Sequence, residues 1–214
     1  MLEVMKMKVY PLVLGPVQTA CYIISNEKKA VVVDPAANAN QIIQYLGTKK
    51  LELEAVLLTH GHFDHIGAVN ELVAKYQVPI YAHKKEKEYF ENPDVNLSPM
   101  IYERLVLNKD FEYRFISDQE VIECLGTKVK AFHVPGHTTG SICYYFESED
   151  IVFTGDTLFK HSIGRTDFIY GNHDQLVKGI RGKLLSLPGH TLVYPGHGEC
   201  TTIGEESKHN PFLV

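Results

Sequence analysis

Residues 58–65 read LTHGHFDH. The first residue of this segment ends the apolar run 53–58, which is typical of a strand buried on both faces. Three imidazoles and one carboxylate therefore fall within six residues. The chance of this pattern arising anywhere in such a chain is about one in a thousand. In a turn, His60 and His62 can point to one side, while Asp64 and His65 at the start of a following helix point to an adjacent place. The segment predicts side chains for two metal ions.

Three later segments share one plan, in which an apolar strand and a tight turn are followed by a ligand-type side chain. They read HVPGHTTGS (133–141), IVFTGDT (151–157) and LVYPGHGE (192–199). Pro135 and Gly136 exclude a helical histidine pair in the first, so at most one of its histidines need be a ligand. We favour His137, and we interpret His133 as a buried hydrogen-bonded histidine or one that orients a ligand. The other two segments contribute Asp156 and His197.

The candidate metal ligands are five imidazoles and two carboxylates: His60, His62, Asp64, His65, His137, Asp156 and His197. One tetrahedral zinc ion cannot use seven protein ligands. Two divalent ions that share Asp156 as a bridge can, at the roughly 3.5–4 Å separation of dinuclear hydrolases. The absence of cysteine from the set fits Zn, Fe or Mn, and we expect two zinc ions.

The pattern of the chain predicts two β-rich halves, each with helices. We expect strands over 9–13, 21–25, 30–34, 53–58 and 79–82, with a helix capped by Asn38 and ending at Gly47 and another from Ile66. Residues 84–118 are interpreted as a mobile insertion with short helices. Further strands follow over 121–124, 128–134, 141–146, 151–153 and 191–194, with a helix over 174–187 capped at Gly189 and a short one near Glu205. The whole chain, residues 1–214, is expected to form a single domain.

Composition excludes several classes of protein. The 214 residues are 44% hydrophobic and carry a formal net charge of −5, so the chain can bury a core and lacks the basic excess of general nucleic-acid binding. Its apolar runs are too short to span a membrane. No apolar leader opens the chain, and four scattered cysteines without a C-x-x-C pair fit a reducing compartment, so we expect a cytoplasmic protein rather than a secreted one.

These motifs together resemble the metallo-β-lactamase superfamily, and within it the glyoxalase II-like hydrolases, whose signature is T-H-x-H-x-D-H followed by a His, an Asp and a final His. The resemblance runs from about Thr59 to His197. It implies a four-layer αββα sandwich of two packed mixed sheets, with the metals at one edge. It also implies that the first metal is held by His60, His62 and His137, that the second is held by Asp64, His65 and His197, and that Asp156 bridges them.

The resemblance implies hydrolysis of a small acyl thioester, such as a hydroxyacylglutathione, by a metal-bridging hydroxide that Asp64 helps to orient. Glyoxalase II enzymes carry a further helical domain after the last ligand, whereas this sequence stops at Val214, which leaves the thiol carrier open. Arg165 either clamps a substrate carboxylate or pairs with Asp167, and Lys160 and Phe159 are weaker candidates for substrate contact. The alternative is a persulfide dioxygenase of the same fold with a single iron on His60 or His62, His137 and Asp156.

Overall fold

The first of two β-sheets is built by the N-terminal half of the chain. The computed structural model describes residues 7–101 and 103–214, and in this part of the chain the first sheet has six strands in sequence order. They are β1 (Lys8–Leu14), β2 (Thr19–Ser25), β3 (Lys29–Val33), β4 (Glu52–Leu57), β5 (Ile80–His83) and β6 (Tyr113–Ile116). The pairs β1–β2 and β2–β3 are antiparallel, whereas β3–β4, β4–β5 and β5–β6 are parallel, so the sheet is mixed.

The second sheet has the order β14-β13-β10-β9-β8-β7. Its strands are β7 (Val121–Cys124), β8 (Thr127–His133), β9 (Ile142–Phe146), β10 (Ile151–Gly155), β13 (Leu192–Pro195) and β14 (Thr201–Thr202). A two-stranded ribbon, β11 (Leu158–Phe159) and β12 (Ser162–Ile163), follows β10. Strand β10 runs parallel to β13 and antiparallel to β9, so this sheet is mixed as well.

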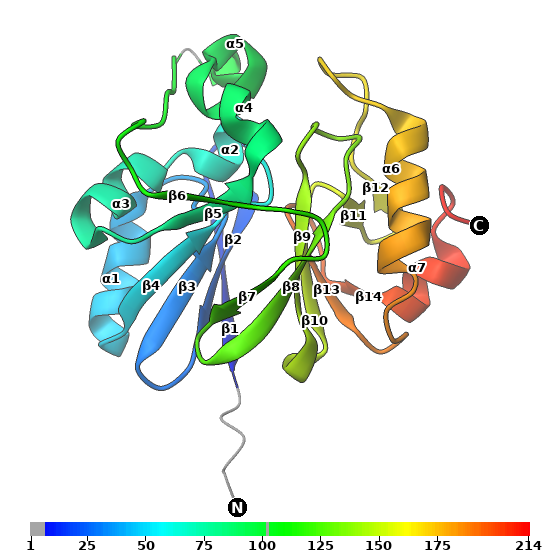
Figure 1. Cartoon of the computed structure of the whole chain (residues 1–214), viewed down its shortest axis with the longest axis horizontal. Coiled ribbons are helices and arrows are strands. Elements are labelled where there is room, and N and C mark those ends of the chain that lie inside the picture. The colour runs from blue at the N-terminus through cyan, green and yellow to red at the C-terminus, as the bar shows by residue number, and fades with distance from the viewer. Residues whose placement is uncertain (1–6, 102) are drawn as a thin grey trace, which may run out of the picture.

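Helices cover the outer face of each sheet, so the layers run helix, sheet, sheet, helix (Figure 1). Alternation within β3 shows why: Ala30 and Val32 pack under the helices, whereas Val31 and Val33 face the other sheet. Both faces of the inner strands are buried, which accounts for their continuous apolar runs. The helices are α1 (Ala39–Lys49) and α3 (Val69–Tyr76) on the first sheet, and α6 (His173–Gly179), the π-helical turn η4 (Ile180–Leu184) and α7 (Ile203–His209) on the second. The predicted αββα sandwich is confirmed.

Three local predictions were wrong. Asn38 has a left-handed backbone and makes no capping side-chain bond, and α1 continues past Gly47 to Lys49. The helix expected over 174–187 with a cap at Gly189 instead gives way to η4 after Gly179 and stops at Leu184, where a π-type bond from the Leu185 N–H to the Ile180 carbonyl loosens the last turn.

The segment 84–118 is more than an insertion of short helices. It holds η1 (Lys84–Glu86), α4 (Lys87–Glu91), α5 (Pro93–Asn96) and η2 (Ser98–Ile101), as expected, but it ends in β6, which was missed. Tyr89, Phe90 and Leu107 are buried, so the segment packs on the body of the protein. Because β6 is only four residues long and lies in a charged stretch, its sequence shows no alternating pattern of apolar residues. The strand forms because it pairs with β5.

Strand direction places the ligand-type side chains at one edge. Strands β8 and β10 are both antiparallel to β9, and β13 is parallel to β10, so β8, β10 and β13 end on the same side of their sheet. The Ile142 N–H of β9 donates to the Thr59 carbonyl at 2.8 Å, which joins the end of β4 to that edge.

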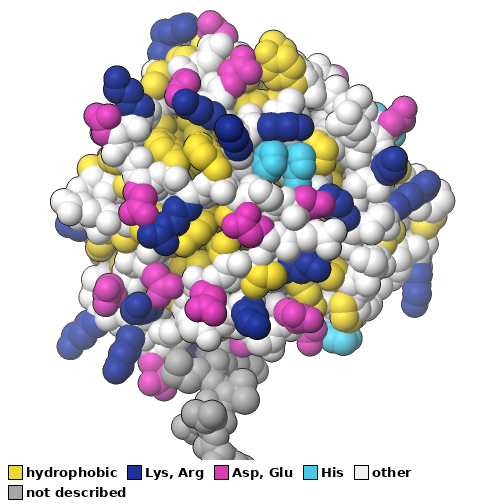
Figure 2. Space-filling model, viewed as in Figure 1, with side chains coloured by type: hydrophobic (Ala, Val, Ile, Leu, Met, Phe, Trp, Pro, Cys, Tyr) yellow, Lys and Arg dark blue, Asp and Glu magenta, His cyan; other side chains and the backbone are white. Residues whose placement is uncertain are grey.

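The remaining surface is mixed in charge. On the face shown in Figure 2, Lys and Arg side chains are interspersed with Asp and Glu around patches of hydrophobic side chains. Among the described residues, no helix combines the length and apolar character that crossing a bilayer requires.

Candidate metal centre

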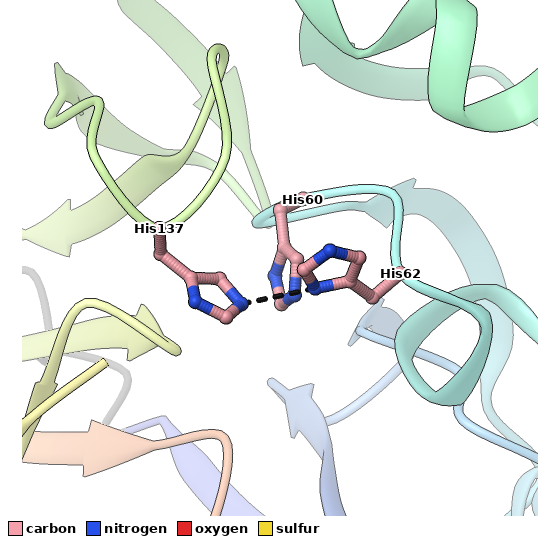
Figure 3. A group of neighbouring side chains, drawn as sticks. All are labelled: His60, His62 and His137. Carbon is pink, nitrogen blue, oxygen red and sulfur yellow. Dashed lines mark hydrogen bonds between the residues drawn. The ribbon is translucent and has the colours of Figure 1, made fainter. Parts of the chain in front are cut away.

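Three buried imidazoles converge at the edge where β4 and β8 end. His60 and His62 leave the loop after β4, and His137 leaves the loop after β8, so the two sheets supply one group (Figure 3). His62 Nδ1 lies 3.0 Å from His137 Nε2, and one ring nitrogen from each of the three residues falls within 4.8 Å of the others. Each side chain is at most 3% exposed. Such a group can hold one metal ion through three nitrogens.

A second group lies beside the first and combines imidazoles with carboxylates. The Oδ2 atom of Asp64 lies 3.4 Å from His65 Nε2 and 3.2 Å from His197 Nε2. Donor atoms bound tetrahedrally at zinc distances lie roughly 3.4 Å apart, which these separations match. The group is therefore spaced to hold a second ion.

Asp156 lies between the two groups. Its Oδ1 is 3.3 Å from His65 Nε2, and its Oδ2 is 3.6 Å from His137 Nε2 and 3.5 Å from His197 Nε2. The carboxylate thus faces one imidazole of the first group and two of the second. This is the placement that a bridging ligand requires.

Unsatisfied polar atoms test whether the residues fit metal ions. His60 Nε2, His62 Nε2, His65 Nε2 and Asp156 Oδ1 are buried and have no hydrogen-bond partner among the described residues. Buried polar atoms are almost always paired, since an unpaired one costs about 1–3 kcal/mol. Three of these atoms, on His60, His65 and Asp156, belong to the donor groups and are accounted for if they bind metal, whereas His62 faces its group through Nδ1; the donor set therefore fits the predicted ions.

Electrostatics differ between the two groups. Burial and the neighbouring imidazoles hold the pKa of His60 well below its usual value and lower that of His62 to about 3, so both rings are neutral and can donate lone pairs. In the second group, burial acts to lower the pKa of His197, but hydrogen bonds to Asp156 and Asp64 raise it to about 9. Asp64 and Asp156 thus stabilise a positive charge in the second group, as the ligands of a cation site do.

Several residues that sequence analysis missed hold these ligands in place. Asp34, at the end of β3, accepts from His65 Nδ1 at 2.9 Å and from the Thr59 hydroxyl at 2.6 Å. A metal could in principle use Asp34 with His60 and His65, but the oxygens of Asp34 are occupied by these bonds and by the Thr59 N–H at 2.8 Å. Asp34 also follows an apolar strand, but without the turn residue that precedes Asp156, so only the carboxylate at a strand end could have indicated it. Thr19 similarly donates to Asp64 at 2.7 Å.

His133 belongs to neither group. Its Nε2 lies 3.0 Å from the Thr139 carbonyl oxygen, and its ring stacks on that of His83 with centroids 4.0 Å apart. His137 Nδ1, by contrast, lies 2.8 Å from the Arg165 carbonyl, which fixes the ring with Nε2 toward the site.

A pocket of about 390 Å³ opens over both groups. Besides metal-site residues, its lining includes Phe159, Arg165 and the apolar Val17, Leu97, Met100, Ile163 and Phe168. Arg165 forms two 2.7 Å hydrogen bonds to Asp167 and stacks on Phe168, with its guanidinium carbon 3.9 Å from the ring centre. Lys160 pairs with Glu199, outside the set of pocket-lining residues. The structure therefore contains the predicted ion pair between Arg165 and Asp167, whereas contact of Arg165 with a substrate stays a prediction.

The fold and this donor set define a metal-dependent hydrolase. A family model described as the metallo-beta-lactamase superfamily matches residues 14–197, and the chain belongs to that superfamily. Among curated proteins, it is 39% identical over 94% of both chains to a probable metallo-hydrolase, YqgX, of Bacillus subtilis. It is 36% identical over 92% of both chains to the hydroxyacylglutathione hydrolase GloC of Haemophilus influenzae.

Solved structures give the same family. The B3 metallo-beta-lactamase BLEG-1 superposes with a TM-score of 0.91 at 40% identity, covering 97% of this chain and all of that one. The protein TTHA1623 in a di-iron-bound form gives 0.84 at 35% identity, covering 96% of this chain and all of that one. ETHE1 from Myxococcus xanthus gives 0.76 at 30% identity, covering 95% and 83%.

Proposed function

We propose that this chain hydrolyses a small acyl thioester with two divalent metal ions, zinc being the expected pair. The observation that carries the proposal is the position of Asp156 between two groups of donors. A hydroxyacylglutathione is the candidate substrate, which the similarity to GloC supports. The di-iron-bound form of TTHA1623 makes iron the first alternative to zinc.

Metal ions bound here would supply an ionised water at neutral pH and polarise a carbonyl oxygen. The chain contributes the rest. Asp64, held by Thr19, would accept a hydrogen bond from the attacking hydroxide and so orient it. Phe159 and Phe168, whose ring centres lie 6.2 Å from that of His197 and 5.7 Å from that of His62, form apolar walls that exclude other water.

The test compares the wild type with His197→Ala. We expect about two ions per wild-type chain and thioester hydrolysis, with loss of one ion and at least a roughly 100-fold fall in kcat in the variant. His190→Ala, which removes an exposed histidine paired with Asp150, is the matched control and should change neither quantity. One iron per chain, oxygen uptake with a persulfide and an activity unchanged by His197→Ala would instead establish the alternative, a persulfide dioxygenase.

A second candidate substrate is a β-lactam, because the chain is 40% identical to a B3 metallo-beta-lactamase. The same residues would orient water toward a strained amide carbonyl. Parallel assays with a chromogenic cephalosporin and a thioester separate the two, and we expect the thioester to give the higher kcat/KM. A higher value with the cephalosporin would reassign the substrate.

Asp167→Asn tests whether Arg165 contacts substrate. Asp167 occupies the Arg165 guanidinium, so the variant frees that cation at the pocket. We expect KM for a thioester whose thiol bears carboxylates to fall roughly two- to fivefold, the range of an exposed ion pair. A thioester of a neutral thiol should be unaffected. Equal changes for both substrates would remove Arg165 from the proposed substrate contacts.

A further inference from the structure

Glu86 is a buried carboxylate that contacts none of the candidate metal ligands directly and yet touches both loops of the first group. It ends η1 and is 0% exposed. Among the described residues it forms no ion pair, and its partners are neutral donors. Its Oε2 accepts from the Gly61 N–H at 2.7 Å, and its Oε1 accepts from the Thr138 hydroxyl and the Gly140 N–H, each at 2.7 Å.

The donors lie next to metal-ligand candidates. Gly61 stands between His60 and His62 in the loop after β4, and Thr138 follows His137 in the loop after β8. Those loops come from different sheets, and the backbone bond from the Ile142 N–H to the Thr59 carbonyl joins them at the strand ends, beside Thr59 rather than at Gly61 or Thr138. The Glu86 carboxylate adds a second connection, at residues that adjoin the histidines themselves.

Close packing reinforces the connection. A Cβ atom on Gly61 would lie 2.5 Å from Tyr89 Cβ, and one on Gly140 would lie 2.7 Å from Glu86 Oε1. Both glycines therefore let the segment that carries Glu86 press against the two loops. This close approach, rather than a tight turn, is the structural reason for glycine at position 61.

The energetics indicate a function beyond filling space. Burying an ionised carboxylate is unfavourable, and charge-assisted hydrogen bonds offset that desolvation penalty. Burial raises the pKa of Glu86 to about 7, against the opposing effect of the bonds from Thr138, Gly61 and Gly140. An apolar side chain would fill the same space without that cost, although it would leave the three donors unpaired.

We propose that Glu86 is a positioning residue that sets the spacing of His60, His62 and His137, so that its loss weakens metal binding at this group and spares the group of Asp64, His65 and His197. The inference rests on the proposed function only in that these histidines hold a metal. It is independent of the substrate.

The experiment measures metal affinity in two backgrounds that each leave one group complete. Chains freed of metal with a chelator are titrated with Zn²⁺ against a chromophoric competitor. His197→Ala keeps the first group and His137→Ala keeps the second. Glu86→Gln is added to each background. The amide nitrogen of the glutamine cannot accept a hydrogen bond, yet it must face either the Gly61 N–H or the donors of Thr138 and Gly140, so at least one of the bonds to Glu86 is lost. Glu91→Gln, an exposed glutamate of the neighbouring helix α4, is the control.

We expect Glu86→Gln to raise the Zn²⁺ Kd about 10- to 100-fold in the His197→Ala background and less than about twofold in the His137→Ala background. If Glu86→Gln weakened Zn²⁺ binding equally in both backgrounds, or changed it in neither, the proposal would be overturned and Glu86 would be a residue that only stabilises the fold. A His197→Ala parent that binds no Zn²⁺ would overturn it together with the proposed metal site. A chain that shows the selective loss but hydrolyses no thioester would contradict the proposed function alone.

A second pair of variants covers the case in which Glu86→Gln does not fold. Thr138→Val deletes one donor to Glu86, and Thr138→Ser keeps the hydroxyl. Selective weakening of the first group by valine and its recovery with serine support the proposal, whereas equal Kd values for the two variants contradict it.

Discussion

Asp156→Ala is expected to lower kcat at least about a thousandfold and to leave less than one tightly bound ion per chain. The carboxylate faces His65, His137 and His197 at 3.3–3.6 Å, so, if it bridges two ions as proposed, its removal takes a ligand from both groups at once. Loss of one electrostatic contact at the reacting atoms alone costs about 100- to 1000-fold in other hydrolases. Here both metal sites would be incomplete as well.

Metal content and single-turnover hydrolysis measure the two effects separately. Asp150→Ala removes an aspartate from the turn before the same strand, where it pairs with His190, and should change neither. If the Asp156→Ala protein kept two ions and lost only turnover, the carboxylate would be a catalytic group and not a bridge.

The ligand edge could be predicted because its segments share a local plan. Each of Asp156, His137 and His197 follows an apolar strand and a breaker residue, and this pattern is visible without a fold. Asp34 follows the apolar strand β3 directly, with the breaker Pro35 after it, and sequence alone cannot tell a carboxylate that binds metal from one that orients His65. That distinction depends on where its two oxygens point.

Other features depend on contacts between distant parts of the chain. Glu86 lies in the run KKEKE, which has the composition of a solvated surface, and it is buried only because loops 25 and 52 residues away close over it. β6 is four residues long and gains its order from β5. For Arg165 the sequence offered two partners; the folded chain adds the bonds to Asp167 and the stacking on Phe168, and contact with substrate stays a prediction.

Gly196→Ala is expected to disrupt the centre although it replaces none of the candidate ligands. A Cβ atom there would lie 2.2 Å from Asp156 Oδ1 and 2.8 Å from His65 Cε1, so something must shift. The Gly196 backbone cannot readily yield, because its N–H donates to Gly155 and its carbonyl accepts from Ala20, both at 2.8 Å. The carboxylate of Asp156 must therefore move. We expect kcat to fall at least about 100-fold, with an overpacking cost of about 1–3 kcal/mol in the free energy of unfolding.

Gly182→Ala is the matched control, because a Cβ atom at that position of η4 meets nothing within 4 Å. The midpoint temperature of thermal unfolding and the metal content should be near the wild-type values in the control, and both should be lower in Gly196→Ala. Supplying excess Zn²⁺ should restore part of the lost activity if the methyl group only displaces Asp156. A Gly196→Ala protein with full metal content and full kcat would show that Asp156 tolerates displacement, which is incompatible with a bridging ligand held between His65 and His137.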